Sequence, residues 1–123
     1  MNVIIDSSVW IDHIRLPEPE MIYLLGGARV VQHPFVTIEV ALGSLKNRVG
    51  ITAMFSDLPQ AVTATHRRLL EYIETAELHG TGIGLVDAHL LASAATADDI
   101  RIWTRDRRLA KQAERLGFAY QAN

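Results

Sequence analysis

The chain contains no cysteine, which excludes disulfide bonds and thiolate-bound zinc and favours a reducing compartment. Long apolar runs are also missing, and the first residues, Met1 to Asp6, lack the basic segment that opens a secretory signal. We therefore expect a soluble protein of the cytoplasm that makes no contact with a membrane.

A strong excess of charge is absent as well. The 12 Lys and Arg residues stand against 14 Asp and Glu residues, so the formal net charge is only -2. This balance argues against a protein that coats nucleic acid by general attraction. A local basic patch would have to make any such contact, and the best candidate is Arg105, Arg107, Arg108, Lys111 and Arg115. A solvated helix face is the alternative interpretation of this group.

The sequence does have the material for a core. With 123 residues the chain is long enough for one domain over residues 1–123 and too short for two, and its hydrophobic fraction of 49% agrees with a proper core. Apolar strand patterns at 2–5, 29–32 and 100–104 alternate with helical patterns, and weaker strand patterns occur at 61–63 and 118–120. This alternation predicts a three-layer α/β/α domain with a central parallel sheet.

The helical patterns also predict which side chains face the core. In the segment 51–58, Met54 and Phe55 are expected to point inward, together with Ile51 and Leu58. In the segment 65–78, Leu70 is expected inward with its apolar neighbours, and Leu42 is expected to share the inner face of its helix with Val36.

Four carboxylates stand where a strand gives way to a helix or on the apolar face of a short helix: Asp6, Glu39, Asp87 and Asp106. Capping of a helix is the ordinary role of a single Asp at such a place. Four that share apolar faces favour a metal site, because each unpaired buried charge would cost several kcal/mol. Oxygen ligands select Mg²⁺ or Mn²⁺ over Zn²⁺.

The expected topology brings these residues together. Asp6 and Asp106 follow strands, and ligands of parallel sheets bind outside the carboxyl ends of the strands. Asp106 is expected to point inward from its helix. The helices that carry Asp87 and Glu39 are expected to begin near the same edge of the sheet. The sequence therefore predicts one acidic pocket built from distant parts of the chain.

Four stretches resemble the motifs of PIN-domain proteins, and within that family the VapC-type toxins of bacterial toxin-antitoxin pairs. They are 4–11, 37–39, 82–94 and 102–109, and they occur in the order of the family and over nearly its full length. The resemblance implies a Mg²⁺- or Mn²⁺-dependent endoribonuclease that cleaves RNA, is inhibited by a cognate antitoxin and forms a homodimer.

The resemblance also implies residue roles. Its acidic quartet falls on Asp6, Glu39, Asp87 and Asp106, as metal ligands, with Glu39 as either a ligand or the group that orients the attacking water. Its small hydroxyl residue falls on Thr104, which would hold a carboxylate or a metal-bound water. Ser7 is expected to cap a helix or donate beside the site, and Arg105, Arg107 and Arg108 are expected to contact RNA.

Alternatives remain at this point. An RNA-processing PIN nuclease without an antitoxin is one, and a non-catalytic PIN module that binds RNA or protein is another. The five histidines show no spacing typical of metal ligands, so surface or partly buried structural roles are expected: His13, His33, His66, His79 and His89. An antitoxin is expected to offer an Arg or Lys to the acidic pocket. Any exposed apolar residues among Trp10, Ile11, Ile14, Met54 and Phe55 would provide a groove for it.

Overall fold

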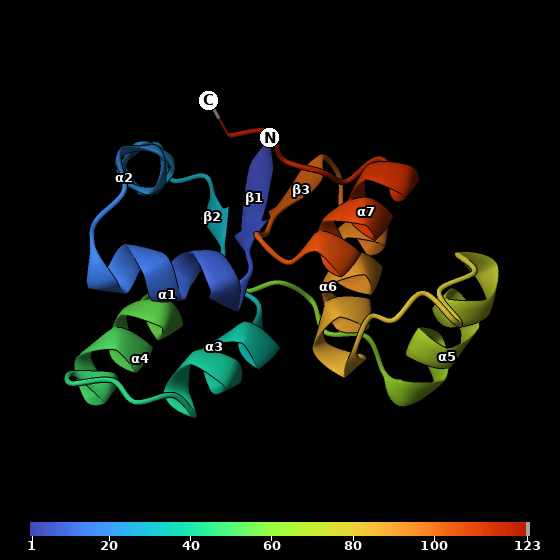
Figure 1. The fold of residues 1–123 in the computed structure, drawn as a ribbon, viewed down its shortest axis with the longest axis horizontal. Coiled ribbons are helices and arrows are strands. Elements are labelled where there is room, and N and C mark those ends of the chain that lie inside the picture. The colour runs from blue at the N-terminus through green and yellow to red at the C-terminus, as the bar shows by residue number, and fades with distance from the viewer. Residues whose placement is uncertain (123) are drawn as a thin grey trace.

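A three-stranded parallel sheet lies at the centre of the molecule (Figure 1). The structure is a computed structural model that describes residues 1–122. β1 (Asn2–Ile5) is the middle strand, with β2 (Val30–Val31) on one side and β3 (Ile100–Trp103) on the other. Both neighbours run parallel to β1, so the predicted parallel sheet is confirmed.

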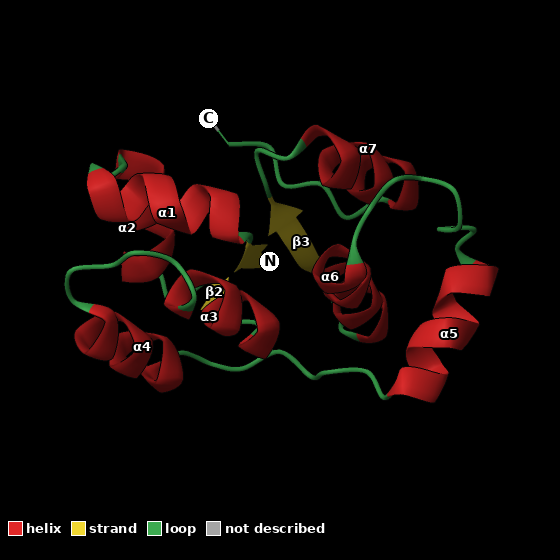
Figure 2. Cartoon of the chain, turned by 60° about the horizontal axis from the view of Figure 1, so that its bottom comes forward, coloured by secondary structure: helices red, strands yellow, loops and turns green. Residues whose placement is uncertain are grey.

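Seven helices surround this sheet within residues 1–122. They are α1 (Ser7–Arg15), α2 (Pro19–Gly26), α3 (Pro34–Ala41), α4 (Arg48–Asp57), α5 (His66–Thr75), α6 (Leu85–Thr96) and α7 (Arg107–Leu116). In Figures 1 and 2, α1 to α4 gather on the side of β2, and α5 to α7 on the side of β3. None of these helices has the length and apolar character that a membrane crossing requires.

The middle strand explains why helices cover both faces of the sheet. Val3, Ile4 and Ile5 point alternately to opposite faces, and all three are buried. Because successive residues of β1 are apolar, both faces of the strand must be covered, and helical layers on the two sides of the sheet cover them. The three-layer α/β/α architecture expected from the sequence is confirmed.

An aromatic contact joins α1 to α4 in the core. The rings of Trp10 and Phe55 meet edge to face with their centroids 4.8 Å apart, and both side chains are fully buried. Such pairs stabilise a core beyond the burial of their area. This contact fixes α1, whose first residues follow Asp6.

Both of the weaker strand predictions are wrong. The segment 61–63 forms no strand, and Gln60 makes a single parallel bridge to Gln32. The segment 118–120 likewise makes one bridge, between Ala119 and Ile102. Val62 is 77% exposed, so the apolar run there has no second layer to pack against.

Three apolar side chains expected to face the core are exposed instead. Met54 is 38% exposed, Leu70 66% and Leu42 82%. In α4 and α5 the neighbouring Phe55 and Leu69 occupy the buried stripe, which is narrower than the sequence pattern suggested. Leu42 is the C-cap of α3, where the helix has already ended.

We predict that Phe55→Ala lowers the free energy of unfolding by about 3–5 kcal/mol, because it opens a cavity beside Trp10. Met54→Ala is the matched control, since it removes a neighbouring side chain that is 38% exposed. The control should change stability by less than about 1 kcal/mol. Urea unfolding of both variants measures the difference, and equal effects would contradict the assigned core.

Candidate functional site

Asp6 lies at the carboxyl end of β1, and its backbone N–H donates to the carbonyl of Trp103 on β3 at 2.9 Å. The residue is 4% exposed and is the N-cap of α1, although its side chain makes no capping bond. Its carboxylate instead accepts hydrogen bonds from Ser8 Oγ at 2.8 Å and from Thr104 Oγ1 at 2.7 Å. Both bonds reach Oδ2, so they fix the orientation of the carboxylate and leave Oδ1 for another partner.

The two hydroxyl groups tie the loop after β3 to the start of α1. Thr104 Oγ1 accepts from the backbone N–H of Asp106 at 3.0 Å, and Ser8 Oγ accepts from the backbone N–H of Arg105 at 3.0 Å. Thr104 makes the kind of contact that its expected role requires, while that role stays a prediction. Ser8 was missed by the sequence analysis, because nothing in the pair Ser7 and Ser8 indicates which hydroxyl faces Asp6.

Asp87 and Glu39 sit in the same electrostatic environment as Asp6. Burial, and then the nearby charges of Asp6 and Asp106, raise the pKa of Asp87 to about 6, with a smaller contribution from Glu39. Burial also raises the pKa of Glu39, which a hydrogen bond from Ser7 opposes and the charge of Asp6 increases. The charges of Asp6 and Asp106 thus oppose ionisation of Asp87, and the charge of Asp6 opposes ionisation of Glu39.

Asp106 differs from the expectation. Asp106 is exposed, and its Oδ1 accepts hydrogen bonds from the backbone N–H groups of Arg108 at 2.9 Å and Leu109 at 3.1 Å. The prediction that it points inward is wrong, because it caps the N-terminus of α7. It still lies close enough to Asp87 to raise the pKa of that residue.

The carboxylates provide the donor set of a hard cation. Among residues 1–122, no three His, Asp or Glu side chains are grouped closely enough to hold a metal ion between them. Mg²⁺ usually keeps several waters and takes only one or two carboxylates directly. Asp6 and Asp87 therefore fit such an ion with water completing its shell, and an ion would relieve the repulsion that Asp87 experiences.

Arg105 is held by the protein itself. Its guanidinium donates to Asp12 Oδ2 at 2.6 Å and to Glu18 Oε2 at 2.7 Å, and its Cζ lies 5.6 Å from the ring centre of Trp103. The hydrogen bond from Arg105 lowers the pKa of Glu18. These contacts position the loop that carries Thr104, and they differ from the RNA contact expected for Arg105.

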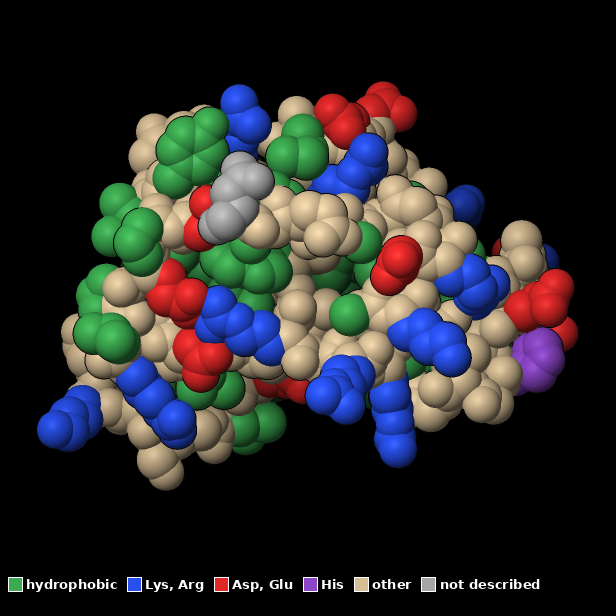
Figure 3. Space-filling model, turned by 45° about the horizontal axis from the view of Figure 1, so that its top comes forward, with side chains coloured by type: hydrophobic (Ala, Val, Ile, Leu, Met, Phe, Trp, Pro, Cys, Tyr) green, Lys and Arg blue, Asp and Glu red, His purple; other side chains and the backbone are tan. Residues whose placement is uncertain are grey.

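The other cations of the basic patch are arranged differently. Arg107, Arg108 and Lys111 line a pocket of about 450 Å³ together with Gly80, Thr81 and Gln112. Arg108 reaches back to the carbonyl of Gly82 at 3.4 Å. Lys and Arg side chains are spread over the face shown in Figure 3, with Asp and Glu side chains among them. The described residues of this pocket include no carboxylate, so it suits an anion.

Two histidines are buried more deeply than expected. His33 has no exposed surface, and its Nδ1 accepts from the backbone N–H of Phe35 at 3.1 Å. Ser93 Oγ donates to the carbonyl of Val62 at 2.6 Å, so His33 Nε2 donates to Ser93 Oγ at 3.0 Å. Burial, and then His89, lower the pKa of His33 to about 4. His89 is also buried, at 2% exposed, so both side chains belong to the interior.

Comparison with known proteins identifies one family and two kinds of relative. Residues 3–115 match the family described as PIN domain. The chain is similar to "Ribonuclease VapC32" of Mycobacterium tuberculosis, in the strains CDC 1551 / Oshkosh and ATCC 25618 / H37Rv. Each is 38% identical over 117 residues, which cover 95% of this chain and 94% of the relative. A third match, "Orotidine 5'-phosphate decarboxylase" of Xanthomonas campestris, is 29% identical over 98 residues and covers 38% of that protein, so it carries no argument about activity.

We predict that Asp87→Asn stabilises the metal-free protein at neutral pH. The pKa of the Asp87 carboxyl rises from 3.8 to about 6 on folding, so the ionised group opposes folding fully above about pH 6. This destabilisation decreases as the pH falls from about 6 to 3.8 and is absent below both values. In EDTA at about pH 7.5 the variant should gain about 1 kcal/mol, which allows for solvent screening. The gain should fade near about pH 4.

Thermal unfolding of wild type and Asp87→Asn across this pH range measures the effect. Glu74→Gln is the matched control, because it neutralises an exposed carboxylate on α5. A loss of stability in Asp87→Asn at neutral pH would show that Asp87 is not in a repulsive environment.

Proposed function

Because this chain belongs to the PIN-domain family, we propose that it is an endoribonuclease and the toxin of a bacterial toxin-antitoxin pair. The family match covers residues 3–115 and confirms the resemblance seen in the sequence motifs. The observation that carries the proposal is the electrostatic coupling of Asp87 to Asp6, Asp106 and Glu39 at the edge where β1 and β3 end. Carboxylates forced together in this way favour a catalytic site over a purely structural one.

The proposed cofactor is Mg²⁺ or Mn²⁺. Asp6 and Asp87 would bind it directly, while Glu39 and Asp106 would act as further ligands or through bound water. When bound, a divalent cation activates the attacking water, neutralises charge on the phosphate and assists the leaving oxygen. All the donor atoms are carboxylate oxygens, which agrees with this choice of metal.

The chain itself would position these groups. Thr104 and Ser8 hold the Asp6 carboxylate by its Oδ2 atom, which keeps Oδ1 directed away from the two hydroxyls. Glu39, beside Ser7, would either bind the metal or orient the attacking water. The capping bonds of Asp106 fix the start of α7 next to Thr104.

RNA contact would come from the basic pocket on α7. Arg107, Arg108 and Lys111 line it, and their cations would bind phosphates on either side of the cut. Arg105 has a positioning part in this proposal, because Asp12 and Glu18 already occupy its guanidinium. The RNA is therefore proposed to enter from the side of α7.

An antitoxin and a second copy of the chain are the proposed protein partners. Ile11 and Ile14 line a groove of about 850 Å³ between α1, α3 and α4, and they are only partly buried. This groove suits an apolar helix of an antitoxin, whose Arg or Lys would reach the acidic pocket. A nuclease without an antitoxin remains the second candidate, because the acidic pocket alone does not distinguish the two.

We predict that purified wild-type protein cuts a mixed cellular RNA pool with Mg²⁺ or Mn²⁺ and is inactive in EDTA. Asp6→Asn and Asp87→Asn should each lower the rate by at least about 100-fold, because an amide keeps the volume and loses the charge. Asp57→Asn, at an exposed carboxylate on α4, is the control and should cut normally. Metal-independent cutting, or full activity in both site variants, would refute the proposal.

We also predict that RNA binding weakens with salt, and that Arg107 and Lys111 account for part of this dependence. Each cation that neutralises a phosphate of a single strand contributes about 0.7 to the slope of log K against log salt. Arg107→Gln with Lys111→Gln should therefore lower the slope by about 1.4. Arg48→Gln, an exposed cation on α4, should leave it unchanged. Binding is measured with Asp6→Asn protein, and an unchanged slope in the double variant would contradict the assigned RNA path.

A further inference from the structure

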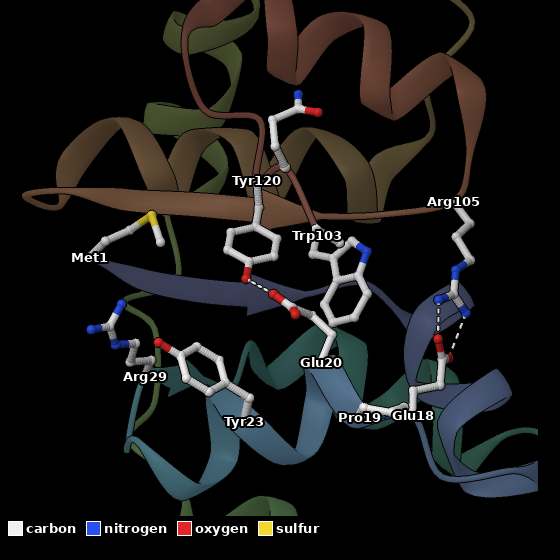
Figure 4. Close-up of a pocket in the computed structure, with 11 residues that line it drawn as sticks. Met1, Glu18, Pro19, Glu20, Tyr23, Arg29, Trp103, Arg105 and Tyr120 are labelled. Carbon is white, nitrogen blue, oxygen red and sulfur yellow. Dashed lines mark hydrogen bonds and ion pairs between the residues drawn. The ribbon is translucent and has the colours of Figure 1, made fainter.

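A second pocket lies outside the acidic site, between α2, the end of β3 and the segment that follows α7 (Figure 4). Its volume is about 760 Å³, which is in the range of sites that hold small ligands. Three aromatic side chains line it, Tyr23 from α2, Trp103 from β3 and Tyr120 from the C-terminal segment. The proposed function has not used this pocket.

The aromatic rings have different exposures. Trp103 is 6% exposed, packs 5.7 Å from the ring of Tyr120 and is covered by the guanidinium of Arg105, so it forms a wall. Tyr23 is 62% exposed, and in Figure 4 its ring and that of Tyr120 extend into the pocket from opposite sides. An open aromatic ring at a pocket is a surface on which a flat ligand stacks.

Four charged side chains line the pocket, and two of them form an ion pair with each other. Arg105 and Glu18 form an ion pair at one end of the pocket. Arg29 lies at the other end, and Glu20, in the middle of the pocket, accepts a hydrogen bond from the hydroxyl of Tyr120 on its Oε1 atom (Figure 4). Burial and this hydrogen bond raise the pKa of Tyr120 to about 12, so the hydroxyl remains a donor at neutral pH. The bond uses one lone pair of Oε1, so both carboxylate oxygens of Glu20 can still accept from a ligand that donates two adjacent hydrogen bonds.

The pocket is joined to the acidic site through β3. Trp103 immediately precedes Thr104, and only two residues lie between it and Asp106, so the Cα atoms of Trp103 and Asp106 are at most about 11 Å apart. The carbonyl of Trp103 also accepts from the backbone N–H of Asp6. The two sites are thus connected through β3, while Met1 and Arg29, which precede β1 and β2, extend the pocket toward the opposite edge of the sheet.

We propose that this pocket binds one unstacked base of the RNA substrate, and that it selects guanine. The inference rests on the proposed function. Proteins recognise single-stranded RNA by stacking bases on aromatic rings and bonding their edges, and Tyr23 provides the ring. A carboxylate only accepts hydrogen bonds, and guanine presents an imino and an amino N–H side by side on its pairing edge. Adenine, cytosine and uracil each place an acceptor next to their donor, so Glu20 disfavours them.

Nucleotide binding in EDTA tests the pocket separately from cleavage. GMP, AMP, CMP and UMP are titrated into the wild-type protein, and tryptophan fluorescence reports on Trp103. GMP is expected to bind most tightly, and Tyr23→Ala should weaken it about 10-fold through the loss of stacking. Glu20→Gln should remove the preference for GMP over AMP. Ile22→Ala, which alters the neighbouring exposed position on α2, is the control and should bind GMP like wild type.

Each outcome decides one claim. Absence of saturable GMP binding, or equal weakening by Tyr23→Ala and Ile22→Ala, overturns the base pocket. Mapping of the cut sites in Mn²⁺ then separates the two proposals. Metal-dependent cuts without a guanine preference would keep the nuclease and reject the pocket, whereas GMP binding without any cleavage would keep the pocket and reject the nuclease.

Discussion

Electrostatic repulsion between Asp87 and the carboxylates around it is the constraint on which the rest of this structure depends. The charges of Asp6, Asp106 and Glu39 all oppose ionisation of Asp87, whose pKa burial has already raised. A fold selected for stability alone would separate or neutralise these groups. The sheet instead holds Asp6 in place, and hydroxyls from Ser8 and Thr104 orient it. The repulsion is therefore maintained by the surrounding structure, which is typical of a site that binds a cation.

The segment from Trp103 to Asp106 connects the features that surround this site. Trp103 walls the second pocket, Thr104 bonds Asp6, Arg105 binds Asp12 and Glu18, and Asp106 caps α7. Successive side chains of one short segment thus serve the proposed base pocket, the acidic site, the contact with α1 and the start of the basic helix. A single stretch of chain can do this because it leaves a buried strand, where alternate side chains face opposite ways.

Much of this architecture could be predicted from the sequence, because strong local patterns determine it. The strands 2–5 and 100–104 and the helix after Asp106 have clear apolar periodicity, and β1, β3 and α7 follow them closely. The failures concern residues whose partners are distant in sequence. Arg105 acquires its role from contacts with Ser8 and Glu18, 87 or more residues away, and the buried His33 bonds Ser93, 60 residues along the chain. Local pattern also could not tell that Asp106 caps α7 at the surface, because inward and capping carboxylates occupy the same position in sequence.

The central claim is that the acidic pocket binds a divalent cation. Its most direct test is a crystal structure of the protein grown with Mn²⁺, in which anomalous scattering locates the metal independently of any activity. The account predicts one or two peaks within bonding distance of the carboxylates of Asp6 and Asp87, with Thr104 and Ser8 still bonded to Asp6. Ordered Asp6 and Asp87 side chains with no peak between them, or Mn²⁺ bound only elsewhere on the chain, would contradict the account.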